Sequence, residues 1–243
     1  DFGASGLSWQ KDESWGNYKV TTLHEYNGAG LKNALIFSDN IYFAKAALKI
    51  GADTFAKQLD KLGFGQDIPF DIGMTSSQYS NGDTFETEVQ LADSGYGQGQ
   101  VLANPLHLAV MYTAFSNSGS MITPYLIYKD DPSAEVWINQ AISKEHSSLL
   151  TEDLKAVVNN PAGSGYAAHR TDMELAGKTG TAELKSEQGT TGQEIGWFSV
   201  FTTDPSASKP VLLTSMVESV EDKGGSTYVV KKDAAVLDSY FGS

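Results

Sequence analysis

The sequence predicts an α+β fold, in which a helical lobe over about 31–170 precedes an antiparallel sheet and a closing helix over about 171–243. Apolar residues recur at helical spacing in the first part, whereas β-branched and aromatic runs dominate the second. The hydrophobic content of 40% is enough for a packed core. No repeat or linker interrupts the chain, so we expect residues 1–243 to belong to one domain.

The helical lobe follows an irregular, glycine- and aromatic-rich stretch (1–30) that carries a short strand at about 18–22. Leu31 to Phe37 has one apolar helical face, and the pattern ends at the polar corner Ser38-Asp39-Asn40. Residues of these types favour helix caps and turns, so the corner lifts Ser38 and Asn40 off the helix faces. Two glycine-terminated helices are predicted next, at 41–50 and about 53–62.

Residues 63–100 are predicted to be mostly loop, and three glycines between Asp93 and Gln100 indicate special backbone angles. Asn104-Pro105 is a cap followed by a first-turn proline, which predicts a helix to about Ser116. A polar loop at 185–194 should join two strands as a hairpin. The remaining predicted elements are a strand at 123–128, a helix at 143–158, strands at 175–184, 195–202 and 211–220, and a helix at 228–240.

Composition excludes several classes of function. The net charge is −13 and no basic stripe is visible, so a nucleic-acid partner is not expected. There are no cysteines, which excludes disulfides and thiol chemistry. The four histidines are dispersed, so we expect no metal site and no cofactor. No apolar run reaches the length of a membrane span.

The most informative stretch is Lys178-Thr179-Gly180-Thr181 within the predicted strand at 175–184. Glycines there let another backbone approach closely, and a strand of this kind can lie beside an extended peptide. An ammonium and hydroxyls at this place suit a carboxylate ligand. The plain alternative is a glycine-containing edge strand with a solvated lysine, just as Ser38 to Asn40 could be only a helix cap.

Two motifs, Ser38-x-Asn40 and Lys178-Thr179-Gly180, together resemble those of penicillin-binding proteins and serine β-lactamases. The segment Ala92 to Gly99 and the strands after the lysine also resemble this family, so the resemblance covers nearly all of the chain from about Trp9. It is closest to low-affinity class B proteins of the methicillin-resistance type. The resemblance implies a peptidoglycan D,D-transpeptidase that is the target of β-lactams.

The chain departs from the family pattern at the nucleophile, which should be a Ser-x-x-Lys motif well before Ser38. The two matches, Ser8 to Lys11 and Ser206 to Lys209, lie in unsuitable places in the sequence. The chain also opens without methionine. We therefore expect a fragment that lacks the nucleophilic serine, the first strands and the central helix of the family fold. By itself this fragment should be inactive.

The resemblance implies a role for each matching residue. Ser38 would pass a proton to the leaving nitrogen, Asn40 would bind the substrate amide, and Lys178 would assist proton transfer. The hydroxyls of Thr179 and Thr181 would bind the substrate carboxylate, and the Thr181 N–H would stabilise the oxyanion. Further substrate-binding candidates are Gly180, Tyr96, Gln98 and Glu183.

Peptidoglycan stem peptides and β-lactam antibiotics are the partners that the resemblance implies. It also implies action at the extracellular face of a Gram-positive cell membrane, with membrane contact only through an N-terminal anchor absent from this chain. Two alternatives stay open. One is a serine β-lactamase or D,D-carboxypeptidase, which would carry its nucleophile near the start of a chain of similar length. The other is a non-catalytic β-lactam sensor domain.

Overall fold

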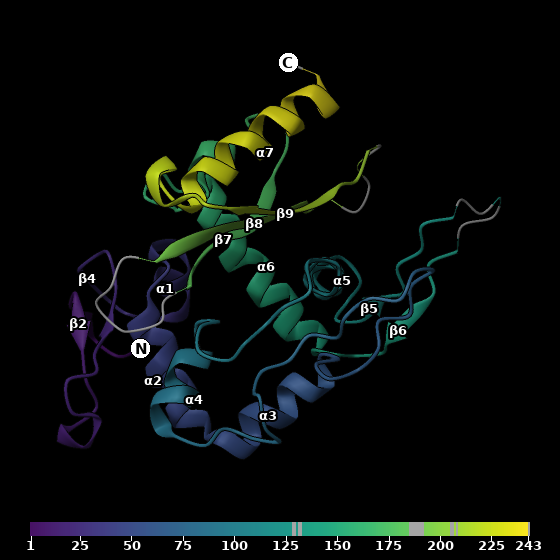
Figure 1. Ribbon diagram of the computed structural model, residues 1–243. Coiled ribbons are helices and arrows are strands. Elements are labelled where there is room, and N and C mark those ends of the chain that lie inside the picture. Colours follow the sequence, from purple (N-terminus) through teal and green to yellow (C-terminus); the bar gives the residue numbers. More distant parts are fainter. Residues whose placement is uncertain (128–129, 131–132, 185–191, 205–206, 208, 243) are drawn as a thin grey trace.

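A three-stranded antiparallel sheet, in the order β7-β8-β9, forms the centre of the computed structural model (Figure 1). The structure describes residues 1–127, 130, 133–184, 192–204, 207 and 209–242. The sheet strands are β7 (Leu175–Leu184), β8 (Gln193–Thr202) and β9 (Leu212–Glu218). Among the described strands, β7 and β9 each pair with β8 alone, so both edges of the sheet lack a strand partner.

The helices are α1 (Leu31–Phe37), α2 (Asn40–Ile50), α3 (Ala52–Lys61), α4 (Glu88–Ser94), α5 (Pro105–Ser116), α6 (Lys144–Asn159) and α7 (Ser226–Phe241). Short 3₁₀ turns occur at Glu13–Trp15, Tyr166–Ala168 and Glu221–Lys223. Short strands pair outside the main sheet: β1 (Ala4–Ser5) with β4 (Tyr26–Asn27), β2 (Ser8–Trp9) with β3 (Val20–Thr21), and β5 (Met121–Ile122) with β6 (Val136–Ile138).

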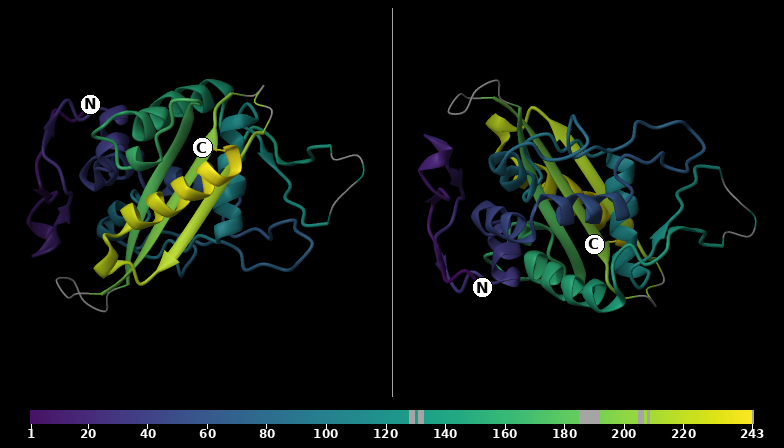
Figure 2. Two further views of the ribbon diagram at one scale, coloured as in Figure 1. Left: turned by 90° about the horizontal axis from the view of Figure 1, so that it is seen from above. Right: turned by 90° about the horizontal axis from the view of Figure 1, so that it is seen from below.

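Helices cover both faces of the sheet. Helix α7 crosses one face, as Figure 2 shows, while α5 and α6 lie on the opposite side. Side chains alternate along β8, so Phe198 joins the core under α7 and Phe201 joins the core with α6. Lys178 pairs in register with Ser199 and therefore shares the α6 face, and Thr179, opposite Phe198, shares the α7 face.

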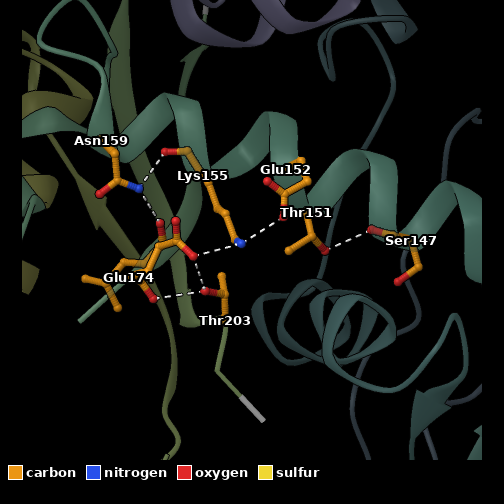
Figure 3. A network of polar contacts seen from close by, with 8 residues as sticks. Ser147, Thr151, Glu152, Lys155, Asn159, Glu174 and Thr203 are labelled. Atoms are coloured by element: carbon orange, nitrogen blue, oxygen red, sulfur yellow. Dashed lines mark hydrogen bonds and ion pairs between the residues drawn. The ribbon is translucent and has the colours of Figure 1, made fainter.

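A polar network holds α6 against the start of β7 (Figure 3). The Asn159 amide donates to the carbonyl oxygen of Leu175 at 3.0 Å. Lys155 forms ion pairs of 2.8 Å with both Glu152 and Glu174, and the Thr203 hydroxyl donates to the Glu174 carboxylate. These contacts fix the position of the strand that carries Lys178.

The α+β fold class is confirmed, and the helices at 31–37, 104–116 and 143–158 and all three long strands lie within two residues of their predicted bounds. Residues 63–100 are mostly loop, as predicted, except for the unpredicted helix α4. The strand predicted at 123–128 is wrong, because its described residues do not form a strand. Strand β5 ends at Ile122, one further backbone bond runs from the Thr123 N–H to the Glu135 carbonyl oxygen, and Pro124 then has no N–H to offer a ladder. Most of the predicted loop 185–194 lies outside the described residues.

Candidate active site

The polar corner between α1 and α2 is held by a buried aspartate. Asp39 is fully buried, and its Oδ1 accepts hydrogen bonds from the backbone N–H groups of Ile41 (2.9 Å) and Tyr42 (3.2 Å). Its Oδ2 accepts from the Tyr26 hydroxyl at 2.7 Å. These bonds cap α2 and hold Ser38 in the left-handed region (φ 53°, ψ 54°), which is uncommon for a residue with a side chain.

Lys178 reaches this corner from β7. Its Nζ donates to Ser38 Oγ at 2.8 Å and to the carbonyl oxygen of Thr179 at 3.0 Å. Burial lowers the pKa of the Lys178 ammonium from 10.5 to about 8. Two groups 140 residues apart in the sequence thus form one hydrogen-bonded pair, in which the lysine is the donor.

The open edge of β7 lies beside this pair. The Thr181 carbonyl oxygen accepts a hydrogen bond from Gln98 Nε2 at 3.2 Å, so it points away from β8. In an antiparallel ladder the N–H and C=O of one residue point to the same side, and the Thr181 N–H therefore also faces the open edge. The strand can offer this N–H to a ligand.

Of the glycines in β7, Gly177 is the one that the packing requires. A Cβ on Gly177 would lie 2.5 Å from the Ser199 carbonyl oxygen. A Cβ on Gly180 would meet the Trp197 Cβ at an ordinary 3.4 Å, so the protein's own packing leaves room for a side chain there.

The two threonine hydroxyls have different surroundings. Thr181 is exposed, and its Oγ1 accepts from the backbone N–H of Ser226 at the start of α7 (3.2 Å). Thr179 is only 6% exposed, and its hydroxyl donates to Ser164 Oγ at 2.7 Å. In this structure the Thr179 proton is therefore bonded inside the protein, and the binding of a substrate carboxylate by Thr179 stays a prediction.

Two other predicted residues, Asn40 and Tyr96, have partners away from the Ser38–Lys178 and Gln98–Thr181 pairs. The Asn40 amide, on the first residue of α2, donates to the Thr21 carbonyl oxygen at 3.1 Å. The half-buried Tyr96 donates to Asp93, which also accepts from Tyr18. Glu183 is exposed two residues beyond Thr181. The substrate-binding roles of Asn40, Tyr96 and Glu183 stay predictions.

The first Ser-x-x-Lys match, Ser8 to Lys11, does not have the surroundings of a nucleophile. Ser8 begins the two-residue strand β2, and Lys11 forms an ion pair with Glu88 on α4. Ser206 lies outside the described residues.

In the part of the chain that the structure describes, no cluster of three or more acidic or histidine side chains could hold a metal ion. Within the same residues, every helix is too short or too polar to cross a lipid bilayer.

Three residues that build the site are not among the predicted site residues: Tyr26, Asp39 and Ser164. Asp39 had a usable signal, since an aspartate directly before a helical apolar pattern is a strong N-cap candidate. Ser164 had only its two flanking glycines as a signal, and Tyr26 had none.

Comparison with known proteins gives related sequences. Residues 2–237 match the family described as "Penicillin binding protein transpeptidase domain". Penicillin-binding protein 3 of Bacillus subtilis (strain 168) is 46% identical over 229 residues, covering 93% of this chain and 34% of that protein. Peptidoglycan D,D-transpeptidase MrdA of Acinetobacter baumannii is 27% identical over 188 residues, covering 65% of this chain and 26% of that protein. The chain thus spans about a third or less of the length of these relatives.

Solved structures show the same fold. A crystal structure of the D,D-transpeptidase domain of a peptidoglycan glycosyltransferase from Eggerthella lenta matches with a TM-score of 0.73 at 22% identity, over 99% of this chain and 60% of that one. The TP domain of Burkholderia pseudomallei penicillin-binding protein 3 matches with a TM-score of 0.79 at 18% identity, over 96% of this chain and 69% of that one. From the match over residues 2–237, this chain belongs to the penicillin-binding protein transpeptidase domain family.

Proposed function

We propose that this chain forms part of the catalytic domain of a peptidoglycan D,D-transpeptidase, which cross-links stem peptides by serine acyl transfer. The observation that carries the proposal is the 2.8 Å hydrogen bond from Lys178 Nζ to Ser38 Oγ, beside the open edge of β7. Family membership supports the same reaction class.

In this proposal the substrate peptide lies along β7, where backbone groups face outward. The exposed Thr181 hydroxyl accepts from Ser226 N–H, so its own proton is available to the substrate carboxylate. The Thr181 N–H is one donor to the developing oxyanion, a contribution typically worth about 3 kcal/mol in acyl-transfer sites. Gln98, already bonded to the Thr181 carbonyl oxygen, closes one side of the groove.

The reaction has two acyl transfers. A serine oxygen attacks the carbonyl carbon of the D-alanyl-D-alanine bond while the lysine of its own Ser-x-x-Lys motif takes the hydroxyl proton, and the C–N bond breaks as the leaving nitrogen takes a proton from Ser38. Lys178 then returns a proton to Ser38, which its pKa of about 8 allows near neutral pH. In the second transfer an amine of a neighbouring stem peptide attacks the ester and gives its proton to Ser38 and Lys178, while the serine oxygen leaves and takes its proton back from the motif lysine.

We further propose that the nucleophilic serine comes from a segment outside these 243 residues. In the match Ser8 to Lys11 the lysine is bound to Glu88, and the match Ser206 to Lys209 follows the lysine motif in the sequence. The outer edge of β9 has no strand partner among the described residues. The B. subtilis relative is about three times as long as the matched region. Such a segment would supply strands for this edge and the nucleophile beside Ser38 and Lys178.

The finer assignments rest on the motif resemblance. We propose a low-affinity class B protein that is acylated by β-lactams, contributes to methicillin-type resistance, and acts at the outer face of the cell membrane through an N-terminal anchor. In a time course of covalent labelling, we expect methicillin to acylate this protein more slowly than it acylates a susceptible transpeptidase.

Covalent labelling of the complete gene product with fluorescent penicillin tests the proposed function. We expect a label that survives denaturation, and a loss of at least about 100-fold in the acylation rate for Lys178→Ala, since a positioned proton-transfer group contributes about 10²–10⁴-fold. Lys231→Ala, on the exposed side of α7, is the matched control and should label normally.

Two outcomes would contradict the proposal. One is a complete gene product that takes no label and releases no D-alanine from a D-alanyl-D-alanine peptide. The other is a Lys178→Ala variant that labels at the normal rate. Residues 1–243 alone should take no label, and a label on Ser8 would show that the nucleophile has been assigned to the wrong segment.

A further inference from the structure

Ser164 touches both halves of the candidate site. It lies in the loop after α6, and its backbone N–H donates to the carbonyl oxygen of Ile36 on α1 at 3.2 Å. Its side-chain oxygen accepts from the Thr179 hydroxyl at 2.7 Å. Ile36 is two residues before Ser38, and Thr179 is next to Lys178, so one residue bridges the elements that bring the hydroxyl and the ammonium together.

The loop that carries Ser164 is packed tightly onto the end of α6. The Gly165 N–H donates to the Val157 carbonyl oxygen at 3.2 Å, and the Gly163 N–H donates to Asn160. A Cβ on Gly163 would lie 2.1 Å from the same Val157 oxygen, so only glycine fits at this position. Helix α6 is itself fixed to β7 through Asn159 (Figure 3). The position of Ser164 is therefore set by backbone contacts and does not depend on its side chain.

The hydroxyls form a directed chain. Lys178 Nζ donates a long hydrogen bond of 3.5 Å to Thr179 Oγ1. The Thr179 hydroxyl in turn donates to Ser164 Oγ. With Ser164 as its acceptor, the Thr179 oxygen keeps a lone pair toward the ammonium. Without that acceptor, the hydroxyl is free to rotate and to direct its proton toward the lysine.

We infer that Ser164 is a positioning residue for the proposed reaction: acting through Thr179, it orients the Lys178 ammonium toward Ser38. The inference rests on the proposed function. Ser164 does not touch the reacting atoms. It sets the direction of the hydrogen bond from the Thr179 hydroxyl, and it connects α1 to β7 next to the Ser38–Lys178 pair.

The test compares acylation rates of the complete gene product with labelled penicillin for Ser164→Ala, Ser164→Thr, Thr179→Val and the double variant Ser164→Ala/Thr179→Val. Ser164→Ala should lower the rate about tenfold, the effect of one hydrogen bond. Ser164→Thr keeps a hydroxyl acceptor and should stay within about twofold. Because Ser164 acts through Thr179, the double variant should be no slower than Thr179→Val alone.

Ser147→Ala is the matched control. It removes another buried serine hydroxyl, which donates to the Ala114 carbonyl oxygen at 3.0 Å, and it should lower thermal stability without changing the acylation rate of the folded protein. Normal labelling of Ser164→Ala overturns the inference, as do additive losses in the double variant. If Ser164→Ala does not fold, a Ser164→Thr variant tenfold slower than the unmodified protein also overturns it. An unmodified protein that takes no label contradicts the proposed function instead.

Discussion

Replacing Lys178 with methionine should stabilise the fold while it abolishes acylation. Burial lowers the pKa of the Lys178 ammonium from 10.5 to about 8, so the folded state binds this proton more weakly than the unfolded chain does. The stability of the unmodified protein therefore rises with pH between about 8 and 10.5, and the full cost of the buried charge is present below pH 8.

The size of the effect follows from the same numbers. The difference between 10.5 and about 8 corresponds to about 3 kcal/mol of unfolding free energy. Solvent reaches part of the Lys178 side chain, which reduces the cost, so we expect Lys178→Met to gain about 1–3 kcal/mol at pH 7. Methionine is close to lysine in volume and needs no hydrogen bond in this place.

Urea denaturation of the complete gene product at pH 7 and pH 10 measures the gain, which should shrink to about a quarter of its pH 7 value at the higher pH. Lys155→Met is the control and should change the free energy of unfolding in the opposite direction. It breaks two ion pairs and should destabilise the protein by under about 1 kcal/mol. A Lys178→Met variant that is less stable than the unmodified protein at pH 7 would refute the reasoning.

Three further predictions concern the site and its supports. The acylation rate should fall as pH rises through about 8, because deprotonated Lys178 no longer donates to Ser38; a flat pH–rate profile would argue against this step. Asp39→Ala should destabilise by about 2–4 kcal/mol in denaturant unfolding, since it leaves buried donors unpaired, whereas exposed Asp53→Ala should be near neutral. Gly163→Ala should lower the melting temperature through its clash with the Val157 oxygen, and an unchanged value would contradict the tight loop.

The sequence predicted most of the fold because its long elements carry redundant signals. The helix at 105–116 has both a cap and a first-turn proline, and β7 combines strand propensity with a recognisable motif. Helix α4 was missed although Thr87 and Gln90 at its start resemble a capping box, and Thr87 does cap it. Strands β5 and β6 were not predicted, because two- and three-residue strands carry little periodic signal.

The contact between Ser38 and Lys178 could be inferred from the motifs. The surrounding contacts that hold the two residues in place could not. The burial of Thr179 and its bond to Ser164 depend on how the loop after α6 packs, which is a tertiary property. Asn40 and Tyr96 match family motifs, yet their polar groups bond to Thr21 and Asp93, because local packing decides which partner a side chain finds.

A crystal structure of the complete gene product acylated by a penicillin tests the central claim most directly. We predict Lys178 Nζ within about 3.5 Å of Ser38 Oγ, with the acyl carbonyl oxygen on the Thr181 N–H and the acyl group on a serine from outside these 243 residues. An acyl group bound elsewhere, or a lysine turned away from the Ser38 corner, would contradict the proposal.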